Sequence, residues 1–305
     1  MKYIFIAFCA LLWQNQAIAQ LPKVSSGQIL RLEAFPSQFI DPHNVYIWLP
    51  DGYSEREKYA VLYMHDGQSL FDSTITWNKQ AWDVDVVAAE LMKRGATRKF
   101  IVVGIWNNGA SRHAEYFPQQ AFEQMSSADQ DTVTAALQRM GRTKERFQPN
   151  SDNYLRFLVR ELKPYVDKNF STRKDRKNTF IAGSSMGGLI SMYAITQYPK
   201  VFGGAVCMST HWPGIFSLEN NPVPAAFEQY LRIKLPKPGK NKFYFDYGTA
   251  TLDAMYPGIQ VRVDAIMREK GYAAAQWQTL RFEGADHSER AWRARLDQPL
   301  MFLLK

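Results

Sequence analysis

The chain has 305 residues, 46% of them hydrophobic and 22% charged, and a formal net charge of +8. This composition excludes an intrinsically disordered chain, and ordinary Gly and Pro usage excludes a collagen-like one. The basic excess does not indicate a nucleic-acid partner, and we expect none, because the densest basic run, at 173–177, lacks interleaved aromatic residues for base stacking.

Residues 1–19 have the pattern of a secretory signal peptide. Lys2 precedes an apolar run over 3–13, and Ala17 and Ala19 are the small residues typical of a signal-peptidase site. The apolar run is shorter than the roughly 20 residues that span a bilayer. We therefore expect cleavage after Ala19, a periplasmic or secreted protein, and no stable membrane anchor.

Along 20–305, short apolar segments alternate with segments of helical periodicity, and no linker divides the chain. The apolar segments predict strands at 29–35, 45–49, 60–65, 100–106, 179–184, 204–208, 242–247 and 277–282. The helical patterns fall at 82–94, 152–168, 186–197, 259–270 and 288–304. Several late strands are apolar without alternation, as expected of parallel strands covered on both faces. The sequence therefore predicts one α/β domain with a mainly parallel sheet flanked by helices.

Residues 118–150 interrupt this alternation. They are polar, and only 129–140 has an amphipathic helical pattern. Long connections in compact domains are either surface excursions or lids over a pocket. We interpret 118–150 as an insertion, and the sequence leaves both roles open.

The most informative segment joins the strand at 179–184 to the helix at 186–197 through Gly183-Ser184-Ser185-Met186-Gly187. Gly-x-Ser-x-Gly between a strand and a helix is the nucleophile-elbow pattern, in which glycines permit a very sharp turn. The turn projects the serine from the carboxyl edge of the sheet. Ser185 is the predicted nucleophile.

A serine hydroxyl is a weak nucleophile until a base removes its proton, so the elbow predicts a histidine and an orienting carboxylate. His287, in the loop after the last strand, is the predicted base, and His211 is instead a candidate for the substrate pocket. Asp253 is the predicted acid because it follows the strand at 242–247, with Asp246 inside that strand as the alternative.

The tetrahedral oxyanion needs two backbone N–H donors. Met186 follows the nucleophile directly, and Gln68 lies in the loop after an early strand, where Gly67 permits a tight path. These two N–H groups are the predicted oxyanion hole.

Four side chains are candidates for substrate binding: Trp106, Arg112, His211 and Trp212. Burial in the core is the alternative for both tryptophans, and a surface ion pair with Glu115 is the alternative for Arg112. The sequence has no His-Glu-x-x-His, no Cys pair and no phosphate-binding loop, so we expect no metal and no cofactor.

Together these segments resemble a known family. The residues that carry the resemblance are His65-Asp66-Gly67-Gln68 with Phe71 and Asp72, Arg112 with Glu115, Tyr116 and Pro118, 183–188, Gly248 and Thr249 with Asp253, and 286–289 with Trp292 and Arg293. Over the whole of 20–305 the chain is similar to esterases of the α/β-hydrolase superfamily that include esterase D-like, feruloyl-esterase-like and enterobactin-esterase-like proteins.

This resemblance implies the α/β-hydrolase fold and serine-dependent hydrolysis of a carboxylic ester, with Ser185, Asp253 and His287 as the triad. The substrate it implies is a small-molecule or carbohydrate ester: sugar-linked, feruloyl-type or siderophore. One alternative is another enzyme that uses the same acyl chemistry, a serine acyltransferase or peptidase. The other alternative is not an enzyme but an inactive exported ligand-binding module.

Overall fold

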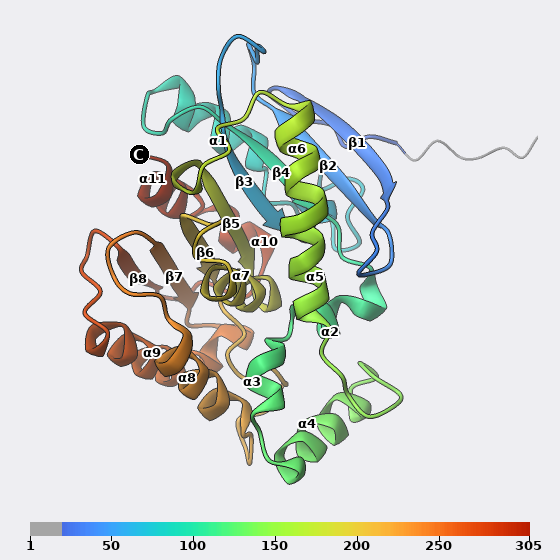
Figure 1. The fold of residues 1–305 in the computed structure, drawn as a ribbon, viewed down its shortest axis with the longest axis vertical. Coiled ribbons are helices and arrows are strands. Elements are labelled where there is room, and N and C mark those ends of the chain that lie inside the picture. The colour runs from blue at the N-terminus through green and yellow to red at the C-terminus, as the bar shows by residue number, and fades with distance from the viewer. Residues whose placement is uncertain (1–19) are drawn as a thin grey trace, which may run out of the picture.

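The computed structural model describes residues 20–305, and the predicted signal peptide lies outside this range. Within it, one sheet has eight strands in the order β1-β2-β4-β3-β5-β6-β7-β8 (Figure 1). The strands are β1 Gln28–Phe35, β2 His43–Leu49, β3 Ala60–His65, β4 Phe100–Ile105, β5 Thr179–Ser184, β6 Gly204–Met208, β7 Lys242–Gly248 and β8 Trp277–Phe282. All eight predicted strands are confirmed.

The sheet is mainly parallel, as predicted. Strand β2 runs antiparallel to both of its neighbours, β1 and β4. From β4 through β3, β5, β6 and β7 to β8, every neighbouring pair is parallel. With helices on both faces, this is the α/β-hydrolase fold. The carboxyl ends of β3 to β8 therefore meet at one edge, where an α/β sheet places its ligands.

The helices are α1 Val84–Lys93, α2 Arg112–Tyr116, α3 Gln119–Glu123, α4 Ser127–Arg139, α5 Ser151–Phe157, α6 Lys163–Asn169, α7 Met186–Gln197, α8 Val223–Lys234, α9 Pro257–Glu269, α10 Glu289–Arg293 and α11 Asp297–Leu304. The predicted helix at 152–168 corresponds to α5 and α6, joined by a π-helical segment, Leu158–Leu162. The predicted helix at 288–304 is divided into α10 and α11. Helix α8 was not among the predictions.

Apolar side chains cover both faces of the sheet. Val61 and Leu62, adjacent in β3, belong to two separate core clusters because successive side chains of a strand point to opposite faces. One cluster includes side chains of α1 and α11, and the other includes side chains of α5 to α9, of which α5 and α6 pass in front of the sheet in Figure 1. This two-sided burial explains the long apolar runs of β3, β4 and β6.

Residues 118–150, the predicted insertion, pack against the core. They carry α3 and α4, and α4 matches the predicted helix at 129–140. Phe122 and Phe147 stack edge-to-face with ring centroids 5.5 Å apart, and both lie near Phe117, at 5.9 and 5.4 Å. Because these rings are buried, the backbone of the insertion is held against the domain.

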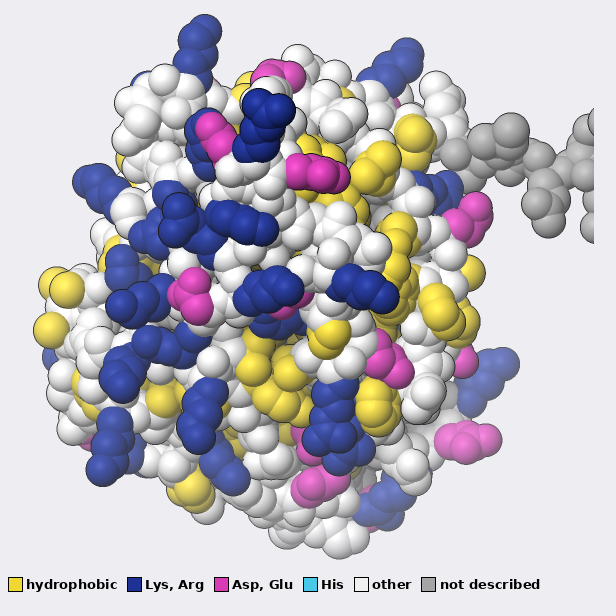
Figure 2. Space-filling model, turned by 45° about the horizontal axis from the view of Figure 1, so that its top comes forward, with side chains coloured by type: hydrophobic (Ala, Val, Ile, Leu, Met, Phe, Trp, Pro, Cys, Tyr) yellow, Lys and Arg dark blue, Asp and Glu magenta, His cyan; other side chains and the backbone are white. Residues whose placement is uncertain are grey.

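Basic side chains are spread over the surface. Figure 2 shows Lys and Arg dispersed over one face with Asp and Glu among them. The run at 173–177 forms its own loop contacts: Asp175 accepts a hydrogen bond from the Lys177 N–H at 2.9 Å, and Arg173 donates to the Lys58 carbonyl at 3.3 Å. Across residues 20–305, none of the helices has the length and apolar character needed to cross a bilayer.

Candidate active site

Ser185 occupies a strained turn between β5 and α7. Its backbone has φ 57° and ψ −124°, a combination that L-residues rarely adopt. A Cβ on Gly183 would lie 2.6 Å from the Gly187 carbonyl carbon, and one on Gly187 would lie 3.3 Å from the His65 Cβ. The predicted strand, sharp turn and helix are therefore present. Glycine is needed at 183 because any side chain there would overlap the backbone of Gly187.

Replacing Gly183 with alanine is expected to lower the free energy of unfolding by about 2 kcal/mol, because the added methyl would overlap the backbone of Gly187. Urea unfolding measures the change. Gly258→Ala in α9 is the matched control, since nothing lies within 4 Å of its Cβ position and it should be no less stable than wild type. Equal stability of the Gly183→Ala variant and wild type would contradict the steric argument.

Asp253 and His287 are hydrogen-bonded to each other. They come from the loops after β7 and β8, and the Asp253 Oδ1 to His287 Nδ1 distance is 2.5 Å. Asp253 is fully buried, whereas 15% of the His287 side chain is exposed. Because an ionised carboxylate only accepts hydrogen bonds, Nδ1 carries the proton and Nε2 keeps its lone pair free. This is the tautomer that a general base needs.

The second oxygen of Asp253 is also fixed. It accepts hydrogen bonds from the Gly248 N–H at 2.6 Å and from the Ser209 hydroxyl at 2.5 Å. Ser209 Oγ in turn accepts from Trp292 Nε1 and from Arg295 Nη2, both at 2.9 Å. The carboxylate therefore cannot rotate away from His287 without breaking these contacts. The sequence did not reveal Ser209 or Arg295 as part of the site.

Asp246, the alternative acid, has a different partner. Its Oδ1 accepts a hydrogen bond from Arg295 at 3.1 Å, and Tyr244 donates to its Oδ2 at 3.2 Å. Burial raises the pKa of Asp246, and the charge of Arg295 opposes that rise. No hydrogen bond joins it to His287 in the described part of the chain, so the geometry favours Asp253.

Tyr256 lies beside both Ser185 and His287. Its ring centroid is 6.0 Å from that of His287. Burial raises the pKa of Tyr256, and hydrogen bonding with the Ser185 side chain acts against the rise. Its hydroxyl is also 2.9 Å from Nδ1 of His211. Tyr256 thus lies against His211 and His287 and near the predicted nucleophile Ser185, and it was not among the predicted site residues.

A cavity of about 470 Å³ opens beside Ser185. Its lining includes Met186, Arg112, His113, Phe216 and the turn at 141–144 of the insertion. Of the predicted substrate-binding residues, the structure brings Arg112 into this wall. His211 is fully buried and packs against Phe216, with ring centroids 4.8 Å apart.

Arg112 forms a two-pronged ion pair with Asp66, with Nε to Oδ1 and Nη2 to Oδ2 distances of 2.7 Å each. The alternative of a surface pair with Glu115 is wrong, because Glu115 is buried and bonds His43 Nε2 at 3.0 Å. Burial acts to raise the pKa of Asp66, but the charge and hydrogen bonds of Arg112 outweigh it and hold that pKa below its usual value.

The structure does not bring Trp106 or Trp212 into the lining of the Ser185 cavity. Trp212 is buried in the core, where its Nε1 donates to Gln260 at 2.7 Å. Trp106 packs against Tyr46, and the Arg31 guanidinium lies 5.3 Å from its ring centroid. Core packing therefore accounts for Trp212, and Trp106 is partly buried against the core cluster that contains Tyr46.

The two predicted oxyanion donors lie at the same edge of the sheet. Gln68 belongs to a 3₁₀ turn, Gly67–Ser69, after β3, and Met186 opens α7 after β5, the neighbour of β3. N–H groups at the start of a helical turn have no acceptor within that turn. A Cβ on Gly67 would lie 2.5 Å from the Gly104 carbonyl carbon, so a larger residue there would displace this loop.

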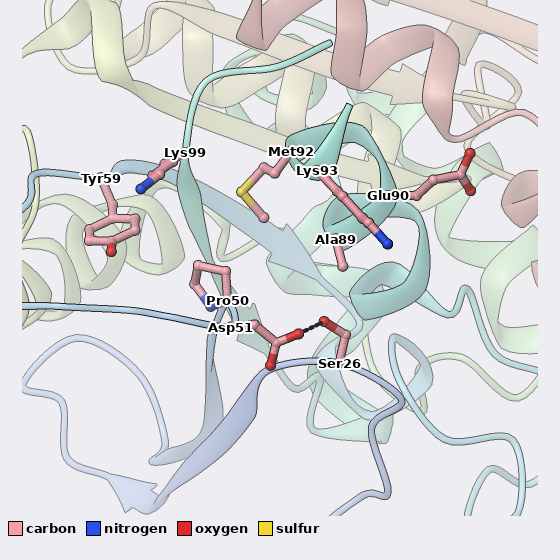
Figure 3. Close-up of a pocket in the computed structure, with 9 residues that line it drawn as sticks. All are labelled: Ser26, Pro50, Asp51, Tyr59, Ala89, Glu90, Met92, Lys93 and Lys99. Carbon is pink, nitrogen blue, oxygen red and sulfur yellow. Dashed lines mark hydrogen bonds between the residues drawn. The ribbon is translucent and has the colours of Figure 1, made fainter. Parts of the chain in front are cut away.

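A second cavity, of about 570 Å³, lies at the opposite edge of the sheet (Figure 3). Tyr59 and Lys99, which line it, directly precede β3 and β4, and Ser26 donates a hydrogen bond to Asp51 at its margin. Ser185 instead follows the carboxyl end of β5. This second cavity is therefore separate from the candidate active site. Among residues 20–305, no group of three or more His, Cys, Asp or Glu side chains is placed to hold a metal ion.

Two buried histidines make stability depend on pH. Burial lowers the pKa of His65 and of His113 from 6.5 to about 3. Between these values the unfolded chain binds more protons than the folded one, so the free energy of unfolding falls as pH falls.

We expect a loss of about 1 kcal/mol per pH unit for each histidine over this window. Urea unfolding near pH 7 and near pH 5 measures the change, and His113→Gln should show a smaller loss than wild type. Equal unfolding free energies at the two pH values would exclude the effect.

The mainly parallel sheet and the Gly-x-Ser-x-Gly turn between β5 and α7 together define a protein of the α/β-hydrolase class. The family model described as "Putative esterase" matches residues 38–303, and the chain belongs to this family.

Two curated relatives are similar over part of their length. An endo-1,4-beta-xylanase/feruloyl esterase of Xylanibacter ruminicola is 26% identical over 270 residues, which cover 85% of this chain and 29% of that protein. The protein YbbA of Bacillus subtilis is 26% identical over 204 residues, 67% of this chain and 66% of that one. The chain thus spans less than two thirds of the length of either relative.

Solved structures share the fold. A ferulic acid esterase superposes with a TM-score of 0.63 at 18% identity, covering 92% of this chain and 98% of that one. The enterobactin esterase of Shigella flexneri gives 0.59 at 15% identity, covering 93% and 60%. At these identities the likeness shows the fold alone.

Proposed function

We propose that the protein is an exported serine esterase that hydrolyses a carboxylic ester through an acyl-enzyme. Ser185 is the nucleophile, His287 the general base, and Asp253 the residue that orients His287. The 2.5 Å bond between Asp253 and His287 carries the proposal, because it supplies a correctly protonated imidazole at the sheet edge where the elbow presents Ser185. Family membership supports ester hydrolysis as the class of reaction.

In the first half-reaction, His287 Nε2 accepts the Ser185 proton while Oγ bonds to the ester carbonyl carbon. The carbonyl oxygen becomes an oxyanion that accepts hydrogen bonds from the N–H groups of Gln68 and Met186. When the intermediate collapses, the carbon–oxygen bond to the alcohol breaks, and the alkoxide takes the proton from Nε2. Water then attacks the acyl-enzyme by the same steps and releases the acid.

The substrate is a small-molecule or carbohydrate-linked ester of the feruloyl, sugar or siderophore type. The names of a similar xylanase/feruloyl esterase and of ferulic acid and enterobactin esterases of the same fold support this range. The insertion at 118–150 forms a cap over one side of the site, since its turn at 141–144 lines the Ser185 cavity. Export rests on the sequence pattern of residues 1–19.

A fluorophosphonate probe tests the proposal directly, because it reacts far faster with an activated serine than with an ordinary hydroxyl group. We expect one probe per chain, located on Ser185 by peptide mass spectrometry, together with turnover of aryl, feruloyl or sugar esters. His287→Ala is the matched control and should remain folded but unlabelled. Folded wild-type protein that neither reacts with the probe nor cleaves any of these esters would refute the proposal. Faster cleavage of peptide amides, or acyl transfer to added alcohols, would assign a different acyl chemistry.

A further inference from the structure

Positive charge is concentrated on one side of the Ser185 cavity. Three of the residues that line it are cations, namely Arg112, Arg142 and Lys144, and the lining includes no Asp or Glu. Arg112 is neutralised by Asp66. Arg142 and Lys144 have no ion-pair partner within residues 20–305. The cavity wall therefore carries two cations that no protein carboxylate compensates.

The neighbouring Arg146 shows the contrast. It lies on the same segment after α4, but its guanidinium pairs with Asp131 at 2.9 Å. The segment thus provides a carboxylate for the arginine that does not line the cavity and none for the two cations that do.

The turn that carries these cations is held in place. Gly141 follows the C-cap of α4 in the left-handed region, at φ 66°. Its N–H donates to the Gln138 carbonyl and the Arg142 N–H donates to the Leu137 carbonyl, both at 2.9 Å. The Gln138 side chain also donates to the carbonyl of Lys144 at 3.3 Å. Leu137 is fully buried. Two charges on a fixed turn lose less conformational entropy on binding a ligand than two on a mobile loop.

His113 adds a second, independent sign of a polar ligand. It is 7% exposed and lines the same cavity, and its Nε2 has no hydrogen-bond partner in the described part of the chain. A buried polar atom without a partner is costly unless a ligand or water completes it.

We propose that the natural ester carries an anionic group, such as a carboxylate, that binds Arg142 and Lys144 while Ser185 attacks the ester carbonyl. The proposal rests on the proposed function and narrows its substrate class to negatively charged esters. Arg142 and Lys144 are specificity-determining residues that contact the substrate away from the reacting carbonyl.

The test compares matched esters that differ only in charge. In the first pair the charge is on the acyl group: the mono-4-nitrophenyl ester of adipic acid, whose second carboxyl is free, is compared with the same ester whose second carboxyl is methylated. In the second pair the charge is on the alcohol: 3-acetoxybenzoate is compared with its methyl ester. Wild type should have a kcat/KM about tenfold or more higher for the charged member of at least one pair, which also identifies the side that faces the insertion.

The double variant Arg142→Gln with Lys144→Gln should lose that preference, mainly through a higher KM for the charged ester of each pair. Lys237→Gln with Lys270→Gln, two exposed lysines outside the cavity lining, removes the same net charge and should keep the preference. Raising the salt concentration should weaken the preference of wild type, because both cations are exposed.

Equal kcat/KM for charged and neutral esters in wild type, or a preference that survives in the double variant, would overturn this inference and leave the esterase assignment intact. If no ester of either charge is cleaved, the proposed function itself fails.

Discussion

Replacing Ser185 with alanine is expected to lower kcat for ester hydrolysis by about 10⁶-fold. The variant lacks the oxygen that forms the acyl-enzyme, so His287 and Asp253 have no proton to transfer. Residual turnover of about 10³-fold over the uncatalysed rate should persist if the Gln68 and Met186 N–H groups still polarise a bound ester. Steady-state assays with a chromogenic ester measure the loss.

Ser184→Ala is the matched control, since Ser184 is the preceding residue, is largely buried and ends β5. It should change kcat only a few-fold and remain reactive toward fluorophosphonate. Thermal unfolding of both variants establishes that they are folded. Comparable turnover in Ser185→Ala and wild type would show that residue 185 is not the nucleophile.

The strands could be predicted because both faces of the sheet are buried. In β5, the residues Thr179–Ser184 are all buried, and the consecutive apolar residues Phe180, Ile181 and Ala182 stand out after the polar run at 171–178. Helix α8 was missed although Phe227, Tyr230 and Leu231 bury one face at helical spacing. Pro222 precedes this helix and Pro224 lies in its first turn, where Pro is well tolerated.

The predicted site residues came from residue type and chain order, whereas their supports depend on tertiary contacts. Ser209 reaches Asp253 only because β6 and β7 are neighbours and its own backbone turns to φ 41°. Nothing adjacent in the sequence marks a serine for that position. Arg295 lies farther along the chain in the segment between α10 and α11, and its partners Asp246 and Ser209 belong to other elements.

The placement of side chains around the cavity was the least predictable part. Trp212 follows β6 at the catalytic edge, but Gln260 of α9 satisfies its indole N–H inside the core. Conversely, Arg142 lies in a polar segment that sequence alone could describe only as an insertion. It lines the cavity because the left-handed Gly141 follows the C-cap of α4 at that point.

Replacing Asp253 with asparagine is expected to lower kcat by about 10⁴-fold while leaving the fold intact. Two donors, the Gly248 N–H and the Ser209 hydroxyl, point at Oδ2 of Asp253. The asparagine carbonyl oxygen should take this position, which turns its NH₂ group toward His287 Nδ1. Nδ1 must then accept a hydrogen bond, so the imidazole proton moves to Nε2. In that tautomer His287 cannot remove the Ser185 proton.

Asp246→Asn is the comparison that separates the two candidate acids. Asp246 is buried against Arg295, so the neutral side chain should lower stability by several kcal/mol, but His287 keeps its partner and kcat per folded molecule should stay within about tenfold of wild type. Circular dichroism with urea unfolding provides the folded fraction for each variant. A larger loss of kcat in Asp246→Asn than in Asp253→Asn would reverse the assignment, because it would mean that the hydrogen bond to Nδ1 does not decide the tautomer of the base.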